Sequence, residues 1–66
     1  SFYDFVNAFR LEAFKEMVEN QEHKQLTLLA LAYECGFNSK SSFNRYFKKQ
    51  TGQTPSEFVK SLKNQS

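Results

Sequence analysis

Residues 39–51 combine side-chain types at a spacing that could recognise a nucleic acid. Placed at helical steps around Phe43, this stretch has aromatic rings on one side and amide, hydroxyl, guanidinium and ammonium groups on the other. In the major groove of DNA, Arg binds guanine and Asn binds adenine through paired hydrogen bonds, while Lys reaches guanine or a phosphate. Base readers cluster near the start of a recognition helix, and flanking polar groups hold phosphates. The predicted base-edge readers are Lys40, Ser41, Asn44 and Arg45, and the predicted phosphate ligands are Ser39, Ser42, Lys48 and Lys49. An ordinary amphipathic helix with a solvated polar face would show the same pattern.

Residues that could support catalysis or metal binding are few. Cys35 is the only cysteine, so no disulfide can form within the chain, and Cys35 with His23 cannot supply the four ligands of a structural zinc site. No nucleophile–base pair, phosphate-binding loop or metal cluster is recognisable. We therefore predict that the chain is not an enzyme and has no cofactor. Cys35 is interpreted as a small core residue and His23 as a solvated loop residue.

Charge is distributed unevenly along the chain. Residues 1–37 contain three basic and six acidic side chains, a balance of −3, whereas residues 38–66 contain six basic and one acidic, a balance of +5. A basic half is typical of a protein that binds a polyanion, although a solvated basic surface gives the same count. There is no apolar run of about 18 residues and no signal-peptide layout. We therefore expect no membrane segment and a cytoplasmic location.

The elements that must position the polar stretch are predicted to be helices. Eight Phe, three Tyr, two Gly and one Pro in 66 residues favour a small all-α domain with an aromatic core. Residues 20–25 are polar and are expected to form a loop. Start and stop signals predict four helices. The first runs from Phe2 to about Glu19 after Ser1, and the second is capped by Thr27 and ended by a turn at Gly36. The third is capped by Ser39 and runs to about Thr51, and the fourth runs from Pro55 to about Leu62 after a capping box formed by Thr54 and Glu57.

The first predicted helix carries two apolar stripes on nearly opposite sides. Leu11, Phe14 and Val18 form one stripe in its second half. The other stripe lies in its first half and consists of Phe2, Phe5, Val6 and Phe9. A surface helix of a globular domain needs only one such stripe, so this helix is expected to contact two packing partners. We predict that the second set is a self-association surface.

Residues 26–58, LTLLALAYECGFNSKSSFNRYFKKQTGQTPSEF, closely resemble the second helix-turn-helix of the AraC/XylS family of transcription activators. The matching positions are Ala32, Gly36-Phe37, Ser39, Phe43, Phe47-Lys48-Lys49, Gly52, Thr54-Pro55 and Phe58. Residues 2–18 resemble the linker helix of that family. The resemblance implies a homeodomain-like fold with a linker helix at 1–19 and a helix-turn-helix unit at 26–62. It also implies a sequence-specific, DNA-binding transcription regulator whose recognition helix, about 39–51, enters the major groove.

The resemblance is partial in one respect. Members of the family carry two helix-turn-helix units with the linker helix packed between them, whereas this sequence starts at the linker helix. The resemblance thus implies a fragment of a longer regulator, whose first unit would cover the stripe around Phe5 and Phe9. The main alternative is a protein-interaction module that docks through this apolar helix. Steep salt dependence would distinguish DNA binding from apolar docking.

Overall fold

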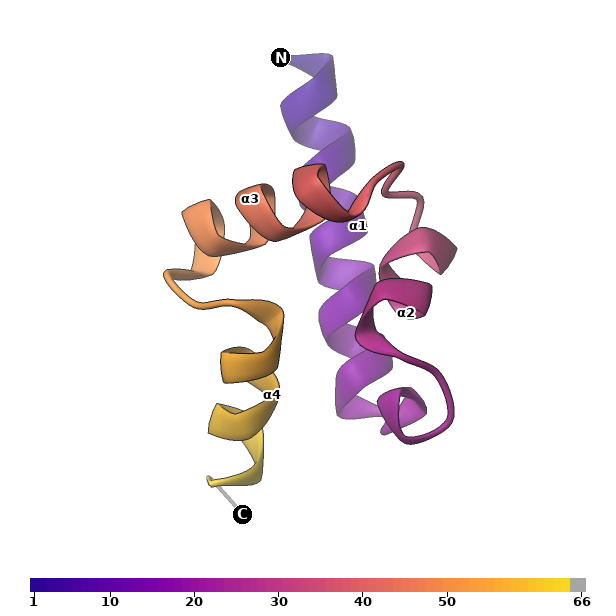
Figure 1. Cartoon of the computed structure of the whole chain (residues 1–66). Coiled ribbons are helices and arrows are strands. Elements are labelled where there is room, and N and C mark those ends of the chain that lie inside the picture. Colours follow the sequence, from indigo (N-terminus) through magenta and orange to yellow (C-terminus); the bar gives the residue numbers. More distant parts are fainter. Residues whose placement is uncertain (65–66) are drawn as a thin grey trace.

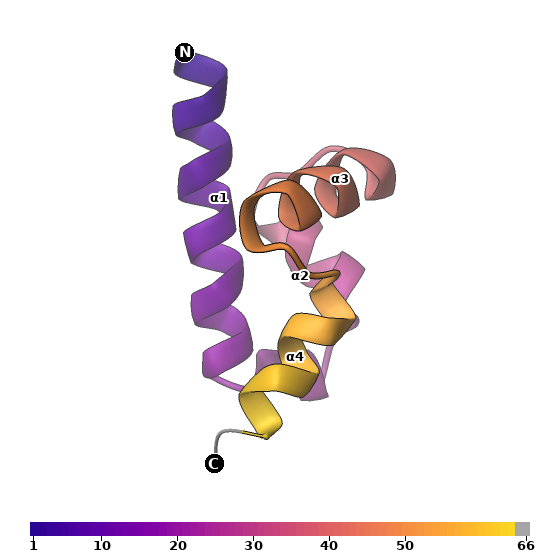
Figure 2. The ribbon, with the colours of Figure 1, turned by 90° about the vertical axis from the view of Figure 1, so that its left-hand side faces the viewer.

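A long N-terminal helix and three shorter helices surround one aromatic core (Figures 1 and 2). The computed structural model describes residues 1–64. Its elements are α1 (Phe2–Glu19), the 3-10 helix η1 (Glu22–Lys24), α2 (Leu28–Glu34), α3 (Lys40–Thr51) and α4 (Pro55–Lys63). The predicted all-α fold is confirmed, and α4 ends one residue later than predicted.

The prediction of a loop at residues 20–25 is wrong in one detail, because Glu22–Lys24 within it form the short 3-10 helix η1. Gln21 adopts a left-handed conformation with φ 65°, which turns the chain immediately after α1. Its carbonyl then accepts a hydrogen bond from the Lys24 backbone N–H, and the Glu22 carbonyl accepts one from Gln25. These local hydrogen bonds pair backbone N–H and C=O groups of the segment. The segment is polar and has no apolar periodicity, so its sequence does not indicate a helix.

Every α-helix begins at the side-chain cap that the sequence predicts. The caps are Ser1, Thr27, Ser39 and Thr54, whose hydroxyl groups accept from the backbone N–H groups of Asp4, Ala30, Ser42 and Glu57. The capping box is also present, since the Glu57 carboxylate accepts a hydrogen bond from the Thr54 N–H at 2.8 Å. These hydrogen bonds from Thr54 lower the pKa of Glu57, and the charge of Lys48 contributes further.

The turn between α2 and α3 depends on Gly36. Its φ of +106° is a conformation that L side chains rarely adopt, and the following Phe37 N–H donates to the Ala32 carbonyl at 3.1 Å. The side chain of Arg10, on α1, presses against the same turn: a Cβ at Gly36 would lie 3.0 Å from the Arg10 Nε. The turn is therefore held both by its own backbone and by α1.

Replacing Gly36 by alanine is expected to lower the free energy of unfolding by about 2 kcal/mol, because strained backbone costs about 1–3 kcal/mol and Arg10 must also shift. Urea denaturation followed by circular dichroism measures the loss. Gly52→Ala is the matched control, since Gly52 has φ +77° but no atom within 4 Å of the new Cβ. Equal losses for the two variants would show that Arg10 does not constrain the turn.

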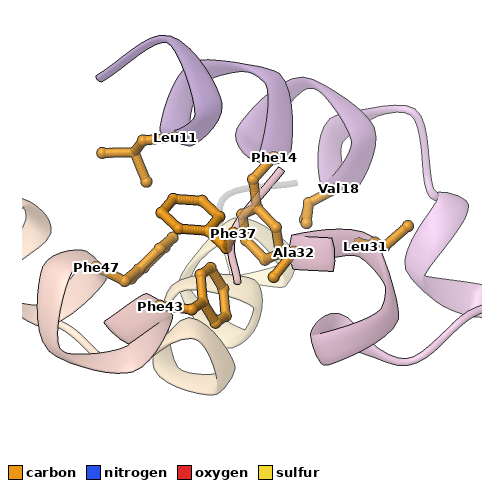
Figure 3. Close-up of a cluster of buried hydrophobic side chains, with 8 residues drawn as sticks. All are labelled: Leu11, Phe14, Val18, Leu31, Ala32, Phe37, Phe43 and Phe47. Carbon is orange, nitrogen blue, oxygen red and sulfur yellow. The ribbon is translucent and has the colours of Figure 1, made fainter. Parts of the chain in front are cut away.

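The core joins α1 to the three shorter helices. Figure 3 shows Leu11, Phe14 and Val18 extending from α1 toward rings that come from α3 and from the turn before it. The Phe14 ring centroid lies 5.0 Å from that of Phe43 and 5.5 Å from that of Phe47. The inward stripe of α1 is thus buried as predicted, and Phe14 packs against one tilted and one edge-on ring of α3.

The opposite stripe of α1 is left uncovered. Phe2 is 82% exposed, and Phe5 and Phe9 are each 72% exposed, while Val6 is half-buried. The N-terminal part of α1 extends beyond α3 in both views of the ribbon (Figures 1 and 2). The exposed fractions of the three rings show that the rest of residues 1–64 leaves them largely uncovered. We call Phe2, Phe5, Val6 and Phe9 the aromatic ridge.

Cys35 is predicted to be a small core residue and His23 a solvated loop residue, and only the first of these predictions agrees with the structure. Cys35 is half-buried at the edge of the core, its thiol points to the Met17 sulfur at 3.6 Å, and burial together with Glu22 and Glu34 raises the pKa of the thiol. It therefore packs as a small hydrophobic residue. The solvated position predicted for His23 is wrong. It is half-buried, and its Nδ1 is shielded without a hydrogen-bond partner among the described residues. His23 lines a pocket together with Val59 of α4.

Candidate nucleic-acid interface

Helix α3 is anchored by aromatic residues on its inner side. Phe43 and Phe47 are buried, and Tyr46 is half-buried with its ring 6.2 Å from that of Phe37. Ser39 in extended conformation starts the helix, and Gly52 with φ 77° ends it. Two rings fixed in the core therefore determine which side of α3 faces outward.

The outward side holds the predicted base readers, and all four are exposed. The structure nevertheless separates them. Lys40 and Asn44 line a hollow beside the starts of α2 and α4, whereas Arg45 lines a notch on the other side, beside the first half of α1. Ser41, Arg45 and Lys48, spaced four and three residues apart, form the row opposite Phe43.

The predicted phosphate ligands are also distributed along both ends of α3. The hydroxyl oxygen of Ser39 accepts the Ser42 N–H at 3.1 Å, so Ser39 acts as the helix cap. Ser42 is half-buried and lines the same notch as Arg45, together with the exposed Lys49. Lys48 is exposed, and its charge helps to lower the pKa of Glu57 on α4. None of these roles is tested by the geometry, so they stay predictions.

The charges of α3 are not neutralised by the described part of the chain. Ion pairs form between the Ser1 ammonium and Asp4, at the cap of α1, and between Lys15 and Glu12 within α1, and neither involves α3. Lys40, Arg45 and Lys49 have no ion-pair partner among the described residues. Such a group of unpaired cations on one helix attracts a polyanion and binds it with release of counterions.

The site also includes Asn7, which the sequence-based prediction does not contain. Asn7 is 8% exposed, and its Oδ1 accepts a hydrogen bond from Arg10 Nη1 at 3.0 Å. Its spacing from Leu11, Phe14 and Val18 places it on the buried stripe of α1, which is the signal that could have revealed it. A buried amide at that position faces α3 across the notch.

Other kinds of site find no support in the described residues. Within residues 1–64, no group of three His, Cys, Asp or Glu side chains could hold a metal ion. None of the described helices is long and apolar enough to cross a membrane.

Comparison with known families agrees with this geometry. A family model described as a helix-turn-helix domain matches residues 1–61, which include α1 as well as the α2–turn–α3 unit. The fold and the exposed basic helix define a DNA-binding helix-turn-helix. The chain belongs to a helix-turn-helix domain family of the AraC type. No curated protein and no solved structure gave a significant match.

Proposed function

We propose that this chain is the DNA-binding part of a transcription regulator, which reads a specific sequence by placing α3 in the major groove. The observation that carries the proposal is the position of α3. Phe43 and Phe47 fix its inner side, and its outer side presents unpaired cations and hydrogen-bond donors. An α-helix fits the major groove, which is about 12 Å wide. We further propose that the chain acts by binding rather than by catalysis, as a part of a longer cytoplasmic regulator.

The side-chain chemistry of Asn44 and Lys48 suits two different roles on α3, base recognition and phosphate binding. The oxygen of an asparagine carboxamide accepts a hydrogen bond from the adenine N6 amino group, and its nitrogen donates one to N7. Asn44 can therefore pair with both positions of one adenine edge. Lys48 is a point charge on a flexible stem, which suits a phosphate oxygen. Asn44 therefore contributes specificity, and Lys48 contributes affinity that is independent of sequence.

Replacing Asn44 by alanine is expected to cost about 1–3 kcal/mol on the preferred duplex and to relax selectivity at one base pair. Replacing Lys48 by alanine should weaken binding to all duplexes alike and reduce the slope of log K against log salt by about one unit. The preferred duplex is selected from random sequences, and binding is measured by fluorescence anisotropy at several salt concentrations.

Lys24→Ala is the matched control for charge, because Lys24 is an exposed cation on η1 and not on α3. It should leave the sequence preference unchanged and have a smaller effect than Lys48→Ala. Equal losses for Asn44→Ala on preferred and scrambled duplexes would remove Asn44 as a reader. A wild-type chain that binds no duplex at low salt would contradict the proposed function itself.

A second candidate function is protein docking through the aromatic ridge, and the exposure of Phe2, Phe5 and Phe9 favours it. Large aromatic rings in water favour association, because burial of each contributes roughly 1.5–3 kcal/mol. In a longer chain with two helix-turn-helix units, we propose that the first unit covers this ridge. For the 66-residue chain alone, we propose that a second copy does so. The two functions are compatible, since the ridge and the outer side of α3 use different residues.

A further inference from the structure

The first half of α1 runs beside α3 (Figure 2), and the notch between them is lined by polar groups from both helices. The residues that matter here are Asp4 and Asn7 from α1, and Ser42, Arg45 and Lys49 from α3. The three α3 residues are spaced three and four apart, so they share one flank of that helix. The notch therefore combines two cations, a carboxylate, a hydroxyl and an amide next to the proposed DNA-binding face.

Asn7 is oriented by a partner outside the notch. Its Oδ1 accepts from Arg10 Nη1, and Arg10 is in turn lodged against the turn at Gly36. With the oxygen engaged, the carboxamide leaves Nδ2 as a hydrogen-bond donor, and this group has no hydrogen-bond partner among residues 1–64. Because Asn7 lines the notch, this unpaired donor is available to an acceptor that enters it.

Charge in the notch favours an anionic acceptor. Arg45 and Lys49 have no ion-pair partner within residues 1–64, whereas the one carboxylate there, Asp4, is partly compensated. Asp4 accepts a hydrogen bond from the Ser1 hydroxyl at 3.1 Å and lies 3.5 Å from the Ser1 ammonium. Its side chain is 78% exposed, so it is at the solvent edge of the notch. Asn7, by contrast, is enclosed.

We propose that this notch clamps one phosphodiester of the DNA strand beside α3, with Asn7 Nδ2 donating a hydrogen bond and Arg45 and Lys49 supplying the charge. The inference rests on the proposed function and adds α1 to the DNA-binding surface. It also reassigns Arg45 from base reading to phosphate binding, which leaves Lys40, Ser41 and Asn44 for the bases. The register of α3 on DNA is then set through α1 as well.

The test uses the 66-residue chain and duplexes in which one phosphate at a time is replaced by a neutral methylphosphonate. For the wild type, neutralising the clamped phosphate should weaken binding about tenfold, as expected for a charge-assisted contact. Asn7→Asp keeps an oxygen for Arg10 but replaces the donor by an anion. This variant should bind the unmodified duplex about tenfold more weakly and should lose its sensitivity to that one methylphosphonate.

Ala8→Asp is the matched control, because it adds the same charge at the next, exposed position of α1. It should lose less affinity and keep the wild-type phosphate profile. Lys49→Gln, on the exposed α3 side, should reduce the same methylphosphonate effect without disturbing the Asn7–Arg10 hydrogen bond, since Arg45 remains in the notch. Asp4→Asn should strengthen binding about twofold.

The proposal is overturned if Asn7→Asp and Ala8→Asp give the same losses and profiles, or if Lys49→Gln keeps the full methylphosphonate effect. In either case the salt-dependent binding of the wild type would still support DNA recognition by α3. Failure of the wild type to bind any duplex at low salt is a different result, and it would remove the proposed function.

Discussion

Replacing Phe14 by alanine is expected to lower the free energy of unfolding by about 3–5 kcal/mol. Phe14 is fully buried, and its ring contacts those of Phe43 and Phe47, so it attaches α1 to the recognition helix. A domain of this size has a total stability of roughly 3–10 kcal/mol. The variant should therefore be largely unfolded in thermal or urea denaturation followed by circular dichroism.

Phe9→Ala provides the matched control, because it makes the same substitution on the same helix at a ring that is 72% exposed. Its effect on the free energy of unfolding should be within about 0.5 kcal/mol of zero, as for other surface changes. Comparable destabilisation by the two variants would mean that α1 does not pack through the side that carries Phe14.

The second large effect concerns association of the chain through the aromatic ridge. We expect the wild type to self-associate at high concentration and the double variant Phe5→Ser/Phe9→Ser to raise the dissociation constant at least about a hundredfold. Each exposed ring contributes roughly 1.5–3 kcal/mol when buried, and a two-fold contact lets each ridge cover its copy. Every substitution then acts twice in the complex.

Sedimentation velocity over a range of concentrations measures this change. Tyr33→Ser is the matched control, because Tyr33 is an exposed ring on α2 and not on the ridge. Raising the salt concentration should leave the association intact while it weakens DNA binding, since only the latter releases counterions. A wild type that remains a folded monomer at millimolar concentration would show that the ridge does not bind a second copy.

Helix boundaries were predictable from the sequence because the signals that set them are local. The caps at Ser39 and Thr54 act through hydrogen bonds to residues three positions later, and both form as predicted. Gly36 and Gly52 end α2 and α3 for an equally local reason, the positive φ that each adopts. The two stripes of α1 were also readable, since apolar periodicity needs only the helical repeat.

The candidate site depended on more than periodicity. The sequence places Ser41, Asn44 and Arg45 on one outer side of a helix, and the structure confirms that they are exposed. The sequence alone does not determine which of these residues faces α1, because that depends on the angle and position at which α1 and α3 cross. The crossing is set by contacts between Phe14 and the α3 rings, which lie about 30 residues apart in the chain.

The burial of Asn7 and the shielding of His23 have the same origin. Each is a polar residue whose environment comes from an element distant in sequence: the turn at Gly36 and α3 for Asn7, and α4 for His23. Local rules assign polar residues to the surface, because an isolated helix or loop would expose them to water. Only the packing of α1 against the later helices removes that water, and it thereby converts Asn7 from a surface amide into part of the proposed phosphate clamp.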